Sequence, residues 1–202
     1  MTPGHCWLAL GALVLGGCGG AAHREAVGLS KVLLEGRQEY TAANATEKDL
    51  VTATGNWAGR IIANGAGRGA QLEQNAAMAD DLAKSAEAVS TQLGQLRKSV
   101  YDLALQQEFV QGVRSSLITQ ITKRQRTLQD LRTSLTEGAA AFRELSQTRA
   151  YKGDSYPQAV DKLNQMAQNY SASPDFLAEA LNSLKTEYGI KDLELATHAA
   201  AR

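Results

Sequence analysis

The stretch LAKSAEAVSTQLGQLRKSV, residues 82–100, places an apolar residue alternately three and four positions after the last. This spacing is the seven-residue repeat of a coiled coil. The repeat keeps one phase from Leu72 to Arg149, where 17 of the 23 positions on the stripe are apolar, against 14 of the other 55. No proline interrupts it. The repeat predicts an all-α fold in which residues 70–150 pack through this apolar stripe.

The positions beside the stripe indicate how many helices meet. A two-stranded parallel coiled coil typically carries Glu and Lys at these positions. Here they hold small or neutral residues, among them Ala76, Ser85, Gln92 and Gln106. Small neutral neighbours widen the contact face and let further helices approach. We therefore expect a bundle of three or four helices.

The N-terminal half supplies two of these further helices. Residues 24–43 form one apolar-periodic segment, and a second begins at Thr46, whose spacing to Asp49 resembles a capping box. The run NGAGRG at residues 64–69 then interrupts the pattern. It lacks the preceding strand and the following Lys-Ser/Thr of a phosphate-binding loop, so we interpret it as a turn.

The C-terminal part adds two shorter helices. Pro157 and Pro174 suit the first turn of a helix, where the missing N–H has no intrahelical acceptor to lose. Gly189 suits a helix stop. The expected helices cover residues 157–170 and 174–188.

Two architectures are compatible with residues 70–150. A turn near Gly112 produces an elongated antiparallel helical bundle, or coiled-coil hairpin, whose arms cover residues 23–65, 70–110, 114–150 and 155–190. Without a turn, residues 70–150 form one continuous helix of about 120 Å with short flanking helices. The unbroken heptad phase favours the continuous helix. The similar arm lengths and the neutral flanks favour the hairpin, which we expect.

The N-terminus has a different composition. Residues 7–17, WLALGALVLGG, are an uncharged apolar run of 11 residues. A membrane span needs about 20 residues, whereas the apolar core of a signal peptide needs roughly 7–15. The run ends directly at Cys18, and the segment Leu15-Gly16-Gly17-Cys18 resembles the lipobox of bacterial lipoproteins. Two other interpretations stay open, an ordinary cleaved signal with an incidental cysteine and the start of a core helix.

The resemblance implies that a peptidase cuts before Cys18, whose thiol carries a diacylglycerol and whose new amine is acylated. It implies a signal peptide over residues 1–17 and a lipidated tether over 18–22. The helix pattern described above then predicts a helical domain over 23–190 and a tail over 191–202. Gly19, in place of Asp after the cysteine, implies the outer membrane, with the body facing the periplasm.

Composition argues against several function classes. Lys and Arg together number 21, as do Asp and Glu, so nothing indicates a nucleic-acid partner. Cysteine occurs only at positions 6 and 18, and histidine at 5, 23 and 198. Nucleophilic triads, zinc sites and di-iron bundles need such residues at close spacing. We expect no enzyme activity, cofactor or metal, and Cys18 as the one functional residue, a lipid-attachment site.

Two arginines, Arg114 and Arg124, stand on the apolar stripe. They can set the register of the helices, reach a partner, or mark a loose centre of the coil. Arg124 also belongs to the densest basic run, residues 123–126, which is either a solvated face or a contact for anionic lipid or a peptidoglycan-associated polymer.

These patterns together predict a membrane-anchored periplasmic lipoprotein. We expect it to act as a structural or adaptor module through coiled-coil surfaces. Its expected partners are the membrane, through the lipid on Cys18, and an envelope protein or further copies of itself. The alternative is a helical lipoprotein that binds a small ligand or assists a transporter, which requires a void in the bundle.

Overall fold

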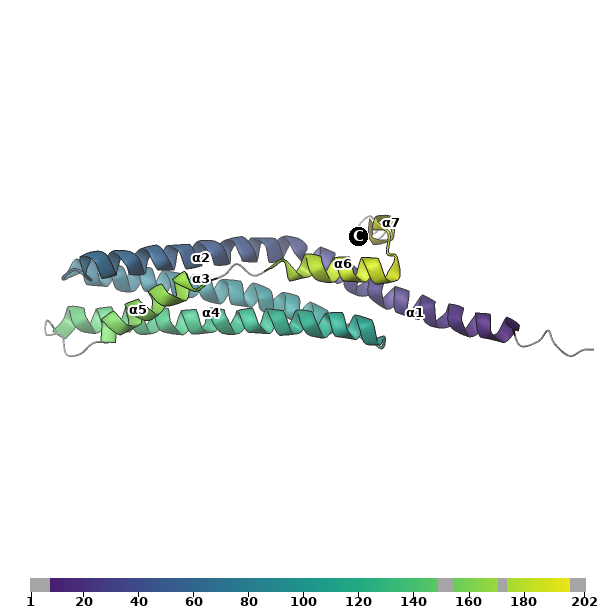
Figure 1. Cartoon of the computed structure of the whole chain (residues 1–202). Helices are drawn as coiled ribbons and strands as arrows, with labels where there is room; N and C mark the ends of the chain where they lie inside the picture. The colour runs from purple at the N-terminus through teal and green to yellow at the C-terminus, as the bar shows by residue number, and fades with distance from the viewer. Residues whose placement is uncertain (1–7, 149–154, 171–173, 197–202) are drawn as a thin grey trace, which may run out of the picture. The chain divides into compact units, whose positions relative to one another are not determined.

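Seven α-helices make up the secondary structure of the residues described here (Figure 1). The computed structural model describes residues 8–148, 155–170 and 174–196, with side chains from Gly20 onward except at positions 155, 156, 193 and 196. No strand occurs in these ranges, and the predicted all-α class is confirmed. The helices are α1 Leu8–Glu35, α2 Arg37–Asn64, α3 Ala70–Tyr101, α4 Glu108–Thr148, α5 Ser155–Gln168, α6 Phe176–Tyr188 and α7 Asp192–Ala196.

The heptad region forms two antiparallel helices. Helix α3 ends at Tyr101 and α4 begins at Glu108, so residues 102–107 interrupt the repeat. In the contacts between the arms, residue numbers increase along α3 while those of their partners on α4 decrease, as expected for antiparallel helices. The contacts are Glu73 with Ser146, Asp80 with Arg143, Glu87 with Arg132, and Ser90 with Gln125. This ladder excludes one continuous helix over residues 70–150 and confirms the hairpin.

The turn lies at residues 102–107 and not near Gly112, which is an exposed residue inside α4. A carboxylate distant in sequence holds it there. Oε2 of Glu25, on α1, accepts hydrogen bonds from the backbone N–H groups of Gln106 at 2.8 Å and Gln107 at 2.9 Å. N–H groups at a helix start have no intrahelical acceptor, and a negative charge there is favourable. Glu25 therefore caps α4 without a local capping residue.

Arg114 closes the same turn from the other side. Its guanidinium donates to the carbonyl of Leu103 at 2.7 Å, and the amide of Gln111 donates to the carbonyl of Leu105 at 2.8 Å. These two side chains supply hydrogen-bond donors to loop carbonyls that face no backbone donor. The polar interruption of the stripe at Arg114 thus marks the turn.

The stripe is the buried face of both arms, as the repeat predicts. The heptad phase does not report whether the chain turns, because each arm places its own apolar face against the core. The stripe residues that are buried include Leu72, Leu82, Val89, Leu93, Val100, Leu117, Ile121, Leu128, Leu135 and Phe142.

The first two helices differ from the expected pattern. Helix α1 ends at Glu35, and α2 then runs from Arg37 through Thr46 and Asp49 without a break. The Thr46 hydroxyl donates to the carbonyl of Ala42, one turn earlier, at 3.0 Å. The predicted capping box is therefore wrong, since a threonine inside a helix can bond back to its own helix.

The expected tether and tail are helical in part. Residues 18–22, the expected tether, belong to α1, and α7 lies within the expected tail.

The predicted turn at residues 64–69 is confirmed between α2 and α3. Gly65, Gly67 and Gly69 have positive φ angles of 77°, 80° and 53°. Gly67 also lacks space for a side chain, because a Cβ there would lie 2.2 Å from Oε1 of Gln71. Glycine is the residue that adopts this conformation without steric cost.

Helices α5 and α6 confirm the expected C-terminal pair with ends shifted by about two residues. The Asp175 carboxylate accepts from the backbone N–H of Ala178 at 3.0 Å and caps the start of α6. Gly189 ends α6 with a left-handed φ of 60°.

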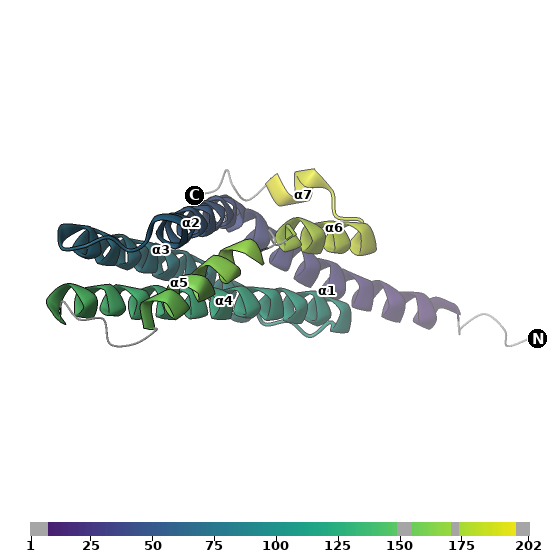
Figure 2. The ribbon, with the colours of Figure 1, turned by 60° about the vertical axis from the view of Figure 1, so that its left-hand side comes forward.

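The chain divides into two compact units. Unit 1 comprises residues 1–38, 97–120 and 175–202, and unit 2 comprises residues 39–96 and 121–174. In unit 1, α6 lies alongside α1, as Figures 1 and 2 both show. Its core includes the fully buried Leu29 and Leu184.

Unit 2 contains parts of four helices, as the neutral flanks of the stripe predict. At its centre the rings of Trp57, from α2, and Phe142, from α4, meet edge to face with centroids 5.8 Å apart. Helix α5 covers this core, with Leu163 buried beside the Gly138 position.

A spin-label distance across the hairpin tests its register. Gln92 and Gln129 are both exposed and lie in unit 2. Antiparallel helices with axes about 8–10 Å apart should bring nitroxides at these positions to on the order of 10–20 Å. We expect this short distance from Gln92→Cys/Gln129→Cys in the body without Cys18, residues 19–202, which has no other cysteine, diluted with unlabelled protein. Positions 37 residues apart in one helix would be about 55 Å apart, and a population at that distance contradicts the hairpin.

Candidate functional site

Unit 2 contains a buried ion pair between its helices. The guanidinium of Arg124, on α4, bonds to the carboxylate of Glu47, on α2. Only 7% of the Arg124 side chain and 3% of the Glu47 side chain are exposed. The Arg124 guanidinium carbon also lies 5.5 Å from the ring centre of Tyr40, in cation–π geometry.

Two tyrosines extend this cluster to the segment after α5. Burial, together with the neighbouring Glu47 carboxylate, raises the pKa of Tyr170 above its ordinary value. The hydroxyl of Tyr40 donates to the carbonyl of Pro174 at 3.5 Å. The cluster therefore connects α2 and α4 with Tyr170 and Pro174. Its members suit a role in holding helix register, because a buried charge is stable only beside its partner.

The position of Arg124 also changes the interpretation of the basic run at residues 123–126. Lys123 and Arg126 are exposed, but Arg124 between them points into the core. The run is not one continuous basic surface. The stripe position of Arg124 was the sequence signal for this site, but its partner Glu47 carried no recognisable pattern.

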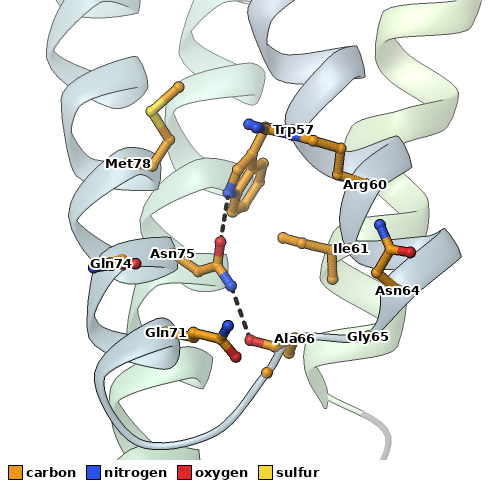
Figure 3. A pocket seen from close by; sticks show the side chains of 11 residues that line it. Trp57, Arg60, Ile61, Asn64, Gly65, Ala66, Gln71, Gln74, Asn75 and Met78 are labelled. Atoms are coloured by element: carbon orange, nitrogen blue, oxygen red, sulfur yellow. Dashed lines mark hydrogen bonds between the residues drawn. The ribbon is translucent and has the colours of Figure 1, made fainter.

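A pocket of about 420 Å³ opens to solvent where α2 and α3 meet at the glycine-rich turn (Figure 3). Trp57 and Asn75 form its inner wall: Nε1 of Trp57 donates to Oδ1 of Asn75 at 3.3 Å, and Nδ2 of Asn75 donates to the carbonyl of Ala66 at 2.9 Å. These bonds use the Asn75 amide to tie the turn to the core. The other lining side chains are Arg60, Ile61, Asn64, Gln71, Gln74 and Met78.

The lining of this pocket combines amide and guanidinium groups with the apolar side chains of Ile61 and Met78. Its aromatic ring, Trp57, is only 1% exposed, so the ring is not available for stacking. Ile62 and Met78, at 50% and 37% exposure, are the exposed large apolar side chains nearest the turn in sequence. The pocket is a depression of mixed polarity that opens to solvent, and it differs from the enclosed apolar void that binding a small apolar ligand requires.

Unit 1 contains a histidine–carboxylate pair that sequence reasoning missed. His23 Nε2 lies 2.7 Å from Oε2 of Glu194, and Nδ1 lies 3.1 Å from the carbonyl oxygen of Tyr188. The hydrogen bond from His23 lowers the pKa of the Glu194 carboxyl below its ordinary value. The pair joins α7 to α1, and among the described side chains no hydroxyl or thiol bonds to His23.

The predicted site residue, Cys18, lies within helix α1, and its side chain is outside the described part of the chain. Cys6, His5 and His198 lie outside the described residues altogether. Within the described ranges, no three His, Cys, Asp or Glu side chains are grouped to hold a metal ion. None of the described helices is both long and apolar enough to span a bilayer.

Comparisons of the chain with protein-family models, with curated proteins and with solved structures found no match.

Proposed function

We propose that this protein is a lipoprotein of the bacterial envelope, anchored through acyl chains on Cys18, with a helical body that serves as a structural or adaptor module in the periplasm. The observation that carries the proposal is the segment Leu15-Gly16-Gly17-Cys18, which directly ends an 11-residue apolar run. Three acyl chains would bind a membrane stably, because one chain alone is marginal and each buried CH₂ adds about 0.8 kcal/mol. The residue after Cys18 favours the outer membrane.

The structural or adaptor role is supported by what the polar groups of the body do. Arg124 and Glu47 join helices inside unit 2, Arg114 closes the hairpin turn, and His23 with Glu194 joins α1 to α7. Each of these groups holds one helix or turn to another. Because the heptad stripe is buried within the chain, an envelope partner would bind the outer faces of the helices.

The alternative function, binding of a small apolar ligand or assistance to a transporter, has weaker support. It calls for a void lined by apolar side chains. The pocket beside Trp57 opens to solvent, and polar groups such as Arg60 and Gln74 share its lining with Ile61 and Met78, so it is not such a void. We therefore favour the adaptor function.

Replacement of the anchor residue tests the proposal. Cys18→Ala removes the thiol that accepts the diacylglycerol, so we expect an uncleaved precursor that takes up no labelled fatty acid. Cys6→Ala should label like the wild type, because Cys6 lies within the segment to be removed. Growth with a labelled fatty acid and gel analysis measure both outcomes. Absence of label in the wild type, or equal labelling of Cys18→Ala, would show that the protein is not a lipoprotein of this kind.

A further inference from the structure

Two of the four large apolar side chains that stand exposed in the described residues lie beside the hairpin turn of unit 1. Tyr101, the last residue of α3, is 69% exposed, and Phe109, in the first turn of α4, is 42% exposed. The rings of Phe109 and Tyr188 meet edge to face with centroids 5.9 Å apart, so aromatic groups from α3, α4 and α6 belong to this end of the unit. We call Tyr101 and Phe109 the turn aromatics.

The turn aromatics lie close to the anchor residue along α1. Glu25 of α1 bonds directly to the backbone of residues 106 and 107, so the turn is level with Glu25. Cys18 precedes Glu25 by seven residues of the same helix, which is about 10 Å at 1.5 Å per residue. All these residues belong to unit 1.

That spacing is slightly greater than the depth of one membrane interface. The two headgroup layers together account for the difference between a hydrocarbon core of about 30 Å and a full bilayer of about 40–45 Å, so each layer is about 5–8 Å deep. Acyl chains on Cys18 would enter the hydrocarbon and hold the start of α1 at the surface. A turn about 10 Å further along α1 is then within reach of the headgroups. Tyrosine is enriched at this interface because its ring is apolar and its hydroxyl is polar.

We propose that the turn aromatics form a membrane-contact surface, in which Tyr101 and Phe109 insert into the interface of the bilayer that holds the lipid on Cys18. This proposal rests on the lipid anchor proposed above. The exposed charges beside the turn aromatics have both signs, Lys98 against Asp102 and Glu108. The contact is therefore apolar in origin and needs no anionic lipid.

Site-directed spin labelling tests this surface in the full, processed protein. The Cys18 thiol is blocked by its lipid and Cys6 leaves with the signal, so Tyr101→Cys or Phe109→Cys supplies a single reactive thiol. Thr119→Cys is the matched control. Thr119 is exposed, belongs to unit 1 and lies ten residues beyond Phe109 on α4, about 15 Å further along the helix.

The labelled proteins are bound to phosphatidylcholine vesicles, and collisions of the nitroxide with oxygen and with a water-soluble nickel chelate are measured by power saturation. Oxygen concentrates in the bilayer and the chelate in water. We expect an oxygen-to-nickel collision ratio severalfold higher at positions 101 and 109 than at position 119. Equal ratios at all three positions would overturn the membrane-contact surface.

Flotation of the vesicles separates this inference from the proposed function. If the protein floats with the vesicles but the labels at positions 101 and 109 lie in water, the lipid anchor is supported and the contact surface is contradicted. If the wild-type protein carries no lipid and does not float, both the lipid anchor and the contact surface are contradicted. Circular dichroism of each labelled variant verifies that the helices are intact.

Discussion

Arg124→Ala should lower the free energy of unfolding by about 3–5 kcal/mol. The change removes the guanidinium that bonds to the buried Glu47 and leaves a carboxylate that is 3% exposed without its partner. An unpaired charge in such a place loses its hydration without compensation. Urea denaturation of the purified mature protein, followed by circular dichroism, measures the effect.

Two further variants separate the ion pair from the general loss of a side chain. Arg126→Ala, two residues away and exposed, should change the unfolding free energy by no more than about 0.5 kcal/mol. The double variant Arg124→Met/Glu47→Met removes both charges and retains apolar volume, so it should recover much of the lost stability. A double variant as unstable as Arg124→Ala would contradict the unpaired-charge explanation.

Phe142→Ala should be about as destabilising, at about 3–5 kcal/mol, because it leaves a cavity in the core of unit 2. The Phe142 side chain is fully buried and its ring contacts Trp57 edge to face. Removal of that aromatic contact adds to the loss of buried apolar area. The indole of Trp57 reports the transition directly, because the other tryptophan, Trp7, belongs to the predicted signal peptide.

The control for this variant is Glu144→Ala, an exposed position two residues away on α4. Its effect should stay within about 0.5 kcal/mol. If Phe142→Ala and Glu144→Ala have the same urea midpoint, the ring does not occupy a packed core, and the burial of the heptad stripe at this level is wrong.

Sequence alone was sufficient wherever local physics decides the structure. The heptad repeat predicted the buried face of α3 and α4, because the side-chain direction of a helix follows directly from its periodicity. The glycines at residues 64–69 predicted the break between α2 and α3, since a positive φ angle is costly for other residues. Pro174 and Gly189 likewise indicated the limits of α6.

Sequence was not sufficient wherever a structural decision depends on residues distant along the chain. The turn at residues 102–107 has no local capping signal, because its cap is Glu25, 81 residues before Gln106. The role of Arg124 was open for the same reason, since its partner Glu47 lies 77 residues earlier. A helix can continue or end at a given point at similar local cost, so contacts made in the folded chain decide between the two. The sequence by itself therefore determined that the chain is helical and which faces are buried, whereas the tertiary structure decided where the heptad region turns and which charges it encloses.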